Sequence, residues 1–291
     1  MLSAGAHAAF SAWVLRRFPA EGEFVEVDGA RQHVVVQGSG PPVVLVHGAN
    51  GVHHDFPAEL LDALAVRHTV LAVDRPGHGF SDILPHRAGL AAHAAALVAV
   101  LRARCGEPAV LVGHSYGAIV ALRAALDAPT HVHAVLALTP VFATDARNQR
   151  WSRLAALRPL AALATWTCAL PVALAVSPSV RRDAWHPAKP PRAFAASRAF
   201  PLRPAQMLVA ADDLRRLGPD LESLRADLPS MRPPLTILAG ERDRVTPWDA
   251  HALPMHHAVT GSTLVRLPEC GHWLMRQQPE GVAAAIEACW A

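Results

Sequence analysis

Short apolar runs that alternate with longer helix-like stretches are the feature that most restricts the fold of this 291-residue chain. The runs are rich in β-branched residues and lack polar alternation, which is typical of parallel strands buried on both faces. They lie at Val43–Val46, Thr69–Val73, Ala109–Val112, Val132–Leu138, Leu235–Leu238 and Thr263–Leu267. The helix-like stretches include Phe56–Val66, Leu90–Arg104, Gly117–Ala128 and Glu280–Trp290. This alternation predicts an α/β fold with a doubly wound, mostly parallel sheet.

Two segments depart from the alternation. Phe24–Val27 and Arg31–Val36 flank Asp28-Gly29, a dipeptide that favours a two-residue turn, so an antiparallel hairpin is expected to open the sheet. Residues 141–204 have no predicted strand, and a structureless loop of that length is uncommon in a compact domain. We therefore predict a helical cap at residues 141–204, inserted after the sixth strand of a core that comprises residues 21–140 and 205–291.

The N-terminal segment, residues 1–20, is expected to stand outside this core. Residues 4–18 predict a short amphipathic helix with Phe10, Trp13 and Val14 on one face. Packing of that face on the domain is the expected arrangement, and weak contact with a membrane surface through this helix or the cap is the alternative. Arginines follow the apolar residues instead of preceding them, which argues against a secretory signal.

The charge distribution and the cysteines of the chain indicate which binding partners and which cellular compartment to expect. The formal net charge of +3 is spread along the chain without a basic tract interleaved with aromatic residues, which argues against nucleic-acid binding. The cysteines form neither a CxxC pair nor a dense disulfide pattern; they are Cys105, Cys168, Cys270 and Cys289. Reduced cysteines and a cytoplasmic location are therefore expected.

The sharpest chemical signal is the sequence Gly-His-Ser-Tyr-Gly at residues 113–117. It follows an apolar strand and precedes a helical run, and in that context the glycines permit a tight turn that exposes the serine hydroxyl in a strained conformation. Backbone N–H groups at the start of the helix favour developing negative charge. Ser115 is therefore the predicted nucleophile.

A serine hydroxyl needs a base, and the base needs a carboxylate that fixes its tautomer. Among 17 histidines, His272 stands out because it follows the last predicted strand, whereas His114 is expected to point away at the turn. His53, His54, His256 and His257 are expected in loops or at the surface. Asp243 follows the strand Leu235–Leu238 and precedes His272. We predict Asp243 as the acid and His272 as the base.

Acyl transfer also needs donors for an oxyanion. The loop after the strand Val43–Val46 faces the predicted nucleophile, so the backbone N–H groups of Ala49 and Tyr116 are the predicted pair. Asn50 in the same loop either contacts substrate or caps a turn, and the turn is the favoured interpretation.

Several of these segments together resemble the α/β-hydrolase fold superfamily, and they match its esterase and C–C hydrolase branch best. They are the His47-Gly48 loop, Asp74–Ser81, residues 113–117, Gly240–Asp243 and Gly271–Trp273. The resemblance spans about residues 22–291. It implies that Asp74–Ser81 is a structural turn near the sheet edge. Serine at position 115 argues against the dehalogenases and epoxide hydrolases of the same superfamily, because their nucleophile is an aspartate.

Substrate contacts are expected from tryptophans of the cap and from the residue after the base: Trp151, Trp166, Trp185 and Trp273. Packing of the cap tryptophans on the core is an equal alternative. The sequence lacks histidine pairs at metal-ligand spacing, a Rossmann string and a P-loop, so neither a metal nor a cofactor is expected. Cys270 is interpreted as a packing residue.

The predicted activity is hydrolysis of short- to medium-chain acyl or aryl carboxylic esters through an acyl-enzyme. One alternative is a C–C bond hydrolase of diketo-acids from aromatic ring cleavage, whose carboxylate would suit the arginine-rich cap. Perhydrolysis by the same triad is another. A small-molecule receptor that keeps the fold without turnover is the non-enzymatic alternative.

Overall fold

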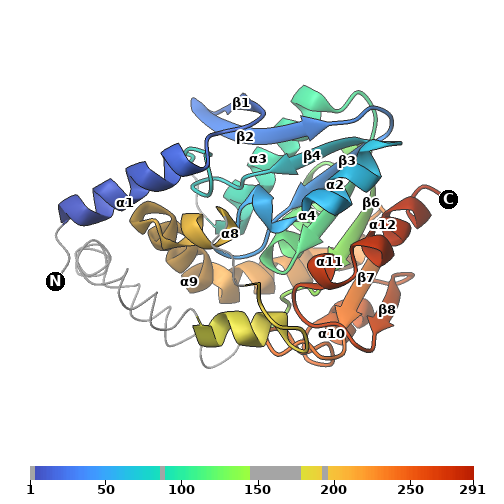
Figure 1. Ribbon diagram of the computed structural model, residues 1–291. Helices are drawn as coiled ribbons and strands as arrows, with labels where there is room; N and C mark the ends of the chain where they lie inside the picture. The colour runs from blue at the N-terminus through green and yellow to red at the C-terminus, as the bar shows by residue number, and fades with distance from the viewer. Residues whose placement is uncertain (1–3, 86–88, 145–177, 192–195) are drawn as a thin grey trace.

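Eight strands form a single sheet in the order β1-β2-β4-β3-β5-β6-β7-β8 (Figure 1). The computed structural model describes residues 4–85, 89–144, 178–191 and 196–291. The strands are β1 (Glu23–Val27), β2 (Ala30–Gln37), β3 (Pro42–Val46), β4 (Thr69–Val73), β5 (Ala109–His114), β6 (Val132–Leu138), β7 (Leu235–Gly240) and β8 (Thr263–Leu267). The β1-β2 and β2-β4 pairs are antiparallel and the remaining pairs are parallel. The predicted fold class is therefore confirmed.

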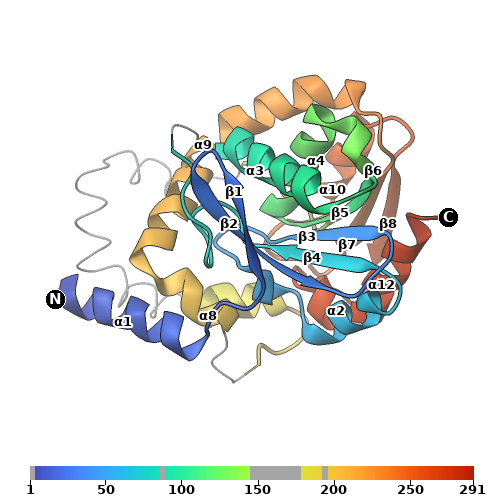
Figure 2. The ribbon, with the colours of Figure 1, turned by 90° about the horizontal axis from the view of Figure 1, so that it is seen from above.

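The helices cover both faces of the sheet, as Figure 2 shows for α3 and α4 on one side and α2 and α12 on the other. Described α-helices are α1 (Ala4–Arg17), α2 (Ala58–Ala65), α3 (Gly89–Arg104), α4 (Tyr116–Asp127), α8 (Ala196–Ala199), α9 (Pro204–Asp227), α10 (Ala252–Ala258), α11 (Leu274–Gln277) and α12 (Pro279–Ala288). Short 3-10 turns are η1 (His53–Asp55), η2 (Pro129–His131), η3 (Phe200–Leu202) and η4 (Leu228–Ser230). β3 and β5 are buried along their whole length because helices pack on both of their faces.

Two apolar clusters, one on each face, form the core. The first joins the sheet to α3, α4, α9 and α10, and the second joins it to α2, α11 and α12. This arrangement leaves the carboxyl ends of β3, β5, β6, β7 and β8 along one edge, since parallel strands end on the same side.

The predicted cap lies only partly within the described residues. Between β6 and β7, residues 178–185 are helical and are followed by α8, η3 and the long helix α9. Trp151, Trp166 and most of the predicted cap lie outside the described residues, so its boundaries stay a prediction.

Helix α1 packs on the segment that returns from the cap. Val14 is fully buried with Val52, Phe200 and two alanines of α8. Trp13, in contrast, is 42% exposed, so its predicted place on the buried face is wrong. The side chain stacks on Phe10, with 6.0 Å between the ring centroids. Within the described ranges, no helix combines the length and apolar character needed to span a lipid bilayer. Contact with a membrane surface remains a prediction.

Short helices account for most differences from the sequence prediction. η1, α10 and α11 each comprise no more than seven residues, too few for an apolar period to identify them. His256 and His257, expected in loops or at the surface, lie in α10, where His257 is exposed and His256 is half-buried. His53, expected at the surface, is buried in η1 because tertiary contacts bring it to the carboxylate of Asp74.

Candidate active site

Ser115 stands at the sharp turn between β5 and α4. Its backbone has φ 54° and ψ −113°, a conformation that non-glycine residues rarely adopt and that stores strain. Gly113 and Gly117 must be glycine because a side chain at either position would overlap backbone atoms of a neighbouring segment. A Cβ on Gly113 would lie 2.4 Å from the carbonyl oxygen of Gly117, and a Cβ on Gly117 would lie 2.2 Å from that of Val46. The turn predicted for residues 113–117 is therefore present, with Ser115 only 8% exposed.

Asp243 and His272 form a buried hydrogen-bonded pair. His272 Nδ1 lies 2.8 Å from Asp243 Oδ2. The other carboxylate oxygen accepts the N–H groups of Val245 and Thr246, at 2.7 and 2.9 Å. Burial alone would raise the pKa of Asp243, but the neighbouring imidazole and these hydrogen bonds lower it below its ordinary value. The carboxylate is therefore ionised at neutral pH.

The Thr246 hydroxyl joins this pair. Its Oγ1 lies 2.8 Å from Asp243 Oδ2 and 3.1 Å from the carbonyl oxygen of Thr139, two acceptors for its proton, and 3.1 Å from His272 Nδ1. Thr139 follows β6 with φ 41°, which is strained for a β-branched residue. Its own hydroxyl donates to the carbonyl oxygen of His272 at 3.0 Å. Thr139 thus connects the loop of Asp243 to the loop of His272.

His114 connects the loop of His272 to the turn that carries Ser115. Its Nε2 donates to the carbonyl oxygen of His272 at 3.0 Å, and the two rings lie 4.8 Å apart. The prediction that His114 points away at the turn is therefore wrong, because its ring contacts the loop of His272. Burial, and then the charge on His272, lower the pKa of His114 to about 3, so that it acts as a neutral donor.

The loop after β3 lies against Ser115. A Cβ on Gly48 would lie 3.2 Å from that of Ser115, so the following residue, Ala49, is also next to the turn. Tyr116 is the first residue of α4, and the first N–H groups of a helix have no acceptor within it. The structure thus places Tyr116 directly after Ser115 and Gly48, the residue before Ala49, against it, and the two donor roles stay predictions.

Asn50 adopts a left-handed backbone conformation, with φ 51°, and this agrees with a turn. Its Nδ2 donates to the carbonyl oxygen of Pro201 at 3.2 Å, whereas Oδ1 has no partner in the described ranges. Gln206, at the start of α9, donates to the carbonyl oxygens of Asn50 and Gly51 at 3.3 and 3.1 Å. The chain returning from the cap therefore holds this loop. Substrate contact by Asn50 stays a prediction.

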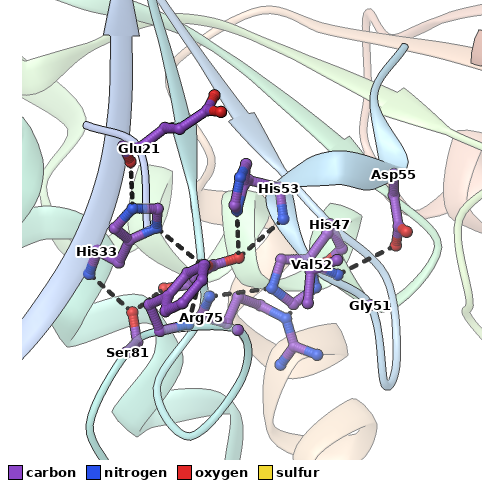
Figure 3. A network of polar contacts seen from close by, with 12 residues as sticks. Glu21, His33, His47, Gly51, Val52, His53, Asp55, Arg75 and Ser81 are labelled. Carbon is purple, nitrogen blue, oxygen red and sulfur yellow. Dashed lines mark hydrogen bonds and ion pairs between the residues drawn. The ribbon is translucent and has the colours of Figure 1, made fainter. Parts of the chain in front are cut away.

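A network of buried polar groups lies behind the same loop (Figure 3). Asp74 is its centre: Oδ2 bonds His33 Nδ1 at 2.9 Å, and Oδ1 bonds His53 Nδ1 at 3.0 Å. Burial would raise the pKa of Asp74, but the two histidines hold it well below its ordinary value. The ligand atoms of these three residues lie within 4.8 Å of one another, a geometry that could hold a metal ion. Each Nδ1 already bonds the carboxylate, so we interpret the cluster as a junction of β2, η1 and the turn after β4.

Two of the predicted substrate-binding tryptophans, Trp185 and Trp273, lie within the described residues. Trp185 and Trp273 are stacked, with 5.9 Å between ring centroids and 13° between the planes. Trp273 also donates its backbone N–H to the carbonyl oxygen of Ala184, so the helix at residues 178–185 packs on the loop of His272. Each ring therefore has one face covered by the other. Whether either contacts substrate stays a prediction. Cys270 is buried and free, and burial raises its pKa, in agreement with a packing role.

Sequence reasoning missed the residues that hold the predicted ones in place. They are His114, Thr139, Thr246, Arg75 and Gln206. Arg75 belongs to the Asp74–Ser81 segment that the family resemblance singled out, which was a usable signal. The others are ordinary threonine, glutamine and histidine residues whose roles depend on contacts between distant parts of the chain.

A sequence model of the Alpha/beta hydrolase family matches residues 43–285. The chain therefore belongs to the α/β hydrolase family, and it is a hydrolase of that class. Its relatives include the pimeloyl-[acyl-carrier protein] methyl ester esterase of Chromobacterium violaceum, which is 30% identical over 81% of this chain and 88% of that protein.

Two further similarities differ in extent. An esterase structure from Exiguobacterium antarcticum superposes with a TM-score of 0.74 at 22% identity and covers 93% of this chain and 100% of that one, a likeness that shows the fold. The dihydrolipoyllysine-residue acetyltransferase component of the acetoin cleaving system of Cupriavidus necator is 40% identical over 133 residues. That match covers 45% of this chain and only 35% of the Cupriavidus protein.

Proposed function

We propose that this chain is a serine carboxylesterase that works through an acyl-enzyme, with Ser115 as nucleophile, His272 as general base and Asp243 as the acid that orients the base. The observation that carries the proposal is the buried His272–Asp243 pair, whose histidine is bonded through its carbonyl oxygen to His114, the neighbour of Ser115. Esterases among the relatives support the same reaction.

The reaction proceeds in two steps. His272 Nε2 takes the proton of the Ser115 hydroxyl as Oγ attacks the ester carbonyl carbon, and the carbonyl oxygen becomes an oxyanion that accepts the N–H groups of Ala49 and Tyr116. The C–O bond to the alcohol then breaks, and His272 gives its proton to the leaving alkoxide. Water deprotonated by the same imidazole attacks the acyl-enzyme, and the carboxylic acid leaves as Ser115 is reprotonated.

The Asp243 carboxylate has two tasks in this sequence. Its Oδ2 accepts the Nδ1–H of His272, which leaves Nε2 free to act as the base. Its negative charge also stabilises the imidazolium that forms when His272 accepts the proton. Oδ1 is held by the N–H groups of Val245 and Thr246, so the carboxylate cannot rotate away from the ring.

Short- to medium-chain acyl or aryl esters are the proposed substrates. The similarity to methyl ester esterases adds methyl esters of medium-chain acids to the set worth testing. A series of p-nitrophenyl esters from acetate to decanoate, followed by methyl esters of the preferred chain length, measures the acyl preference. Faster cleavage of a ring-cleavage diketo-acid than of any ester would replace this proposal with the C–C hydrolase.

Ser115→Ala tests the assignment of the nucleophile. The variant is expected to retain the thermal unfolding curve of the wild type and to lose p-nitrophenyl butyrate hydrolysis by at least about a thousandfold. Ser230→Ala, which removes an exposed hydroxyl on η4, is the matched control and should retain full activity. A Ser115→Ala enzyme that turns over the ester at the wild-type rate would overturn the proposal.

A further inference from the structure

Arg75 holds the peptide group that carries one of the proposed oxyanion donors. The carbonyl oxygen of Gly48 and the N–H of Ala49 belong to the same peptide group, and Arg75 Nη2 donates to that carbonyl oxygen at 2.9 Å. We propose that Arg75 is a positioning residue of the oxyanion hole, whose guanidinium aims and polarises the N–H of Ala49. The inference rests on the proposed function, in which that N–H stabilises the transition state.

The planarity of the peptide bond explains how Arg75 can aim the donor. In a trans peptide the C=O and N–H bonds point in opposite directions, so a contact that fixes the carbonyl also fixes the N–H. Arg75 Nε donates in addition to the carbonyl oxygen of His47 at 3.2 Å. With the guanidinium bonded to two consecutive carbonyl oxygens, the peptide before Ala49 cannot rotate without breaking a charged hydrogen bond.

Polarisation follows from the number and charge of the donors on the Gly48 carbonyl. Besides Arg75, that oxygen lies 2.9 Å from His47 Nδ1 and 3.2 Å from the N–H of Gly51. Donors on a carbonyl withdraw electron density from the peptide nitrogen and make its N–H a stronger donor, and a cationic donor does so most. The Ala49 N–H is therefore better prepared for an oxyanion than an isolated amide.

His47 supports the arrangement as a neutral ring. Its Nε2 accepts the backbone N–H of Arg75 at 3.0 Å, a contact visible in Figure 3, so the ring proton resides on Nδ1 and points at Gly48. Burial, and then the charge of Arg75, hold the pKa of His47 well below its ordinary value. The tautomer that donates to Gly48 therefore persists across the working pH range.

The guanidinium is fixed on its other side. Its Nη1 donates to Asp213 Oδ2 at 3.1 Å, and its side chain is only 1% exposed. Asp213 belongs to α9 and also accepts His93 Nε2 at 2.7 Å. A buried charge with a bonded counter-ion is tolerated, and its interactions are stronger than in water. The Arg75 Cζ also lies 4.8 Å from the ring centroid of Tyr116, the residue that carries the second proposed donor.

A purely structural role for Arg75 predicts different kinetics from a positioning role. Loss of packing alone would lower stability and affect substrate binding and turnover together. Loss of oxyanion stabilisation lowers kcat and leaves KM nearly unchanged, because the interaction is made in the transition state only. It also weakens an inhibitor whose adduct carries an oxyanion by the same factor.

The experiment compares full-length Arg75→Lys, Arg75→Met and Arg123→Met with the wild type. Lysine keeps a positive charge for Asp213 but lacks the separate nitrogens that reach His47, Gly48 and Asp213 at once. It therefore remains informative if the methionine variant does not fold. Arg123 bonds Asp127 and Asp227 at the far end of α4, so its removal controls for the loss of an ion-paired arginine. Initial rates with p-nitrophenyl butyrate and inhibition by a butyl trifluoromethyl ketone are measured.

For Arg75→Lys we expect kcat to fall about 10-fold with KM within about twofold of the wild type, and for Arg75→Met about 100-fold. Removing a donor outright costs about 10²–10³ in kcat, and here the donor is only weakened. The inhibition constant of the ketone should rise in parallel with the fall in kcat. Arg123→Met should lower the unfolding temperature and leave both kinetic quantities unchanged.

Two outcomes overturn the inference. One is a loss of activity in the Arg75 variants that appears in KM alone, with the ketone bound as tightly as by the wild type. The other is an equal loss of kcat in Arg123→Met. Mass spectrometry of the fluorophosphonate-treated wild type and of fluorophosphonate-treated Ser115→Ala keeps the two proposals separate. Label on the wild type but not on Ser115→Ala supports the proposed nucleophile, whatever the Arg75 variants show.

Discussion

Asp55 is a buried carboxyl group for which the structure provides little stabilisation of charge. It lies in η1 behind the loop after β3, and its side chain is 3% exposed. Oδ2 accepts the N–H of Val52 at 3.2 Å, whereas Oδ1 has no hydrogen-bond partner in the part of the chain that the structure describes. Burial raises the pKa of Asp55 to about 7, despite the opposing charge of Arg276.

The sign of its effect on stability follows from where the proton is bound. Between about pH 4 and pH 7 the unfolded chain has released the Asp55 proton and the folded protein still holds it. The folded state binds more protons, so the free energy of unfolding falls as the pH rises through this interval and levels off above pH 7. From the difference between about 7 and 3.8, the whole loss amounts to about 4 kcal/mol.

Asp55→Asn removes this loss because asparagine has the shape of the protonated acid and never ionises. The difference between the free energies of unfolding of the variant and of the wild type should therefore increase in favour of the variant by about 2–3 kcal/mol from pH 5 to pH 8. Urea unfolding followed by tryptophan fluorescence at both pH values measures it. Asp62→Asn, which replaces an exposed carboxylate on α2, is the control and should show no such growth. An Asp55→Asn advantage that is equal at pH 5 and pH 8 would refute the reasoning.

Two further predictions concern the threonine beside the acid and the buried histidines. Thr246→Val removes the hydroxyl that contacts Asp243, His272 and Thr139. We expect kcat for p-nitrophenyl butyrate to fall about 10-fold and the free energy of unfolding to fall by about 1–3 kcal/mol. Thr246→Ser should restore most of the activity and of the stability, and a valine variant as active as the wild type would contradict this prediction. Burial lowers the pKa of His78 and His114 to about 3, so the unfolded state binds their protons first as the pH falls. The contribution of these histidines to the free energy of unfolding is complete above about pH 6.5 and is lost below it, at about 2 kcal/mol for each histidine by pH 5. The two losses together exceed the gain that protonated Asp55 gives over the same fall in pH. Urea unfolding from pH 8 to pH 4 should show the decline, and a stability that rises steadily on acidification would exclude it.

The sequence determined the sheet because local patterns suffice for that. β4, β6 and β8 begin and end at the predicted residues, since short apolar runs between turn residues leave little choice of register. The turn at residues 113–117 was also readable, because only glycine fits where Gly113 and Gly117 approach other backbone atoms. The contact between Asp243 and His272 was predictable for a related reason: parallel strands bring the loops after β7 and β8 to one edge.

The contacts that hold these residues were decided by the tertiary structure alone. Asp213 and Gln206 lie more than a hundred residues from the groups that they bond, and nothing in a local pattern marks such pairs. The same holds for His114, whose ring was expected to point away and instead bonds the loop of His272. A local sequence pattern specifies backbone conformation and the face that a side chain takes. The pairing of buried polar groups is decided only when distant elements pack against each other. Each buried donor must then bond an acceptor among the groups that packing brings within reach.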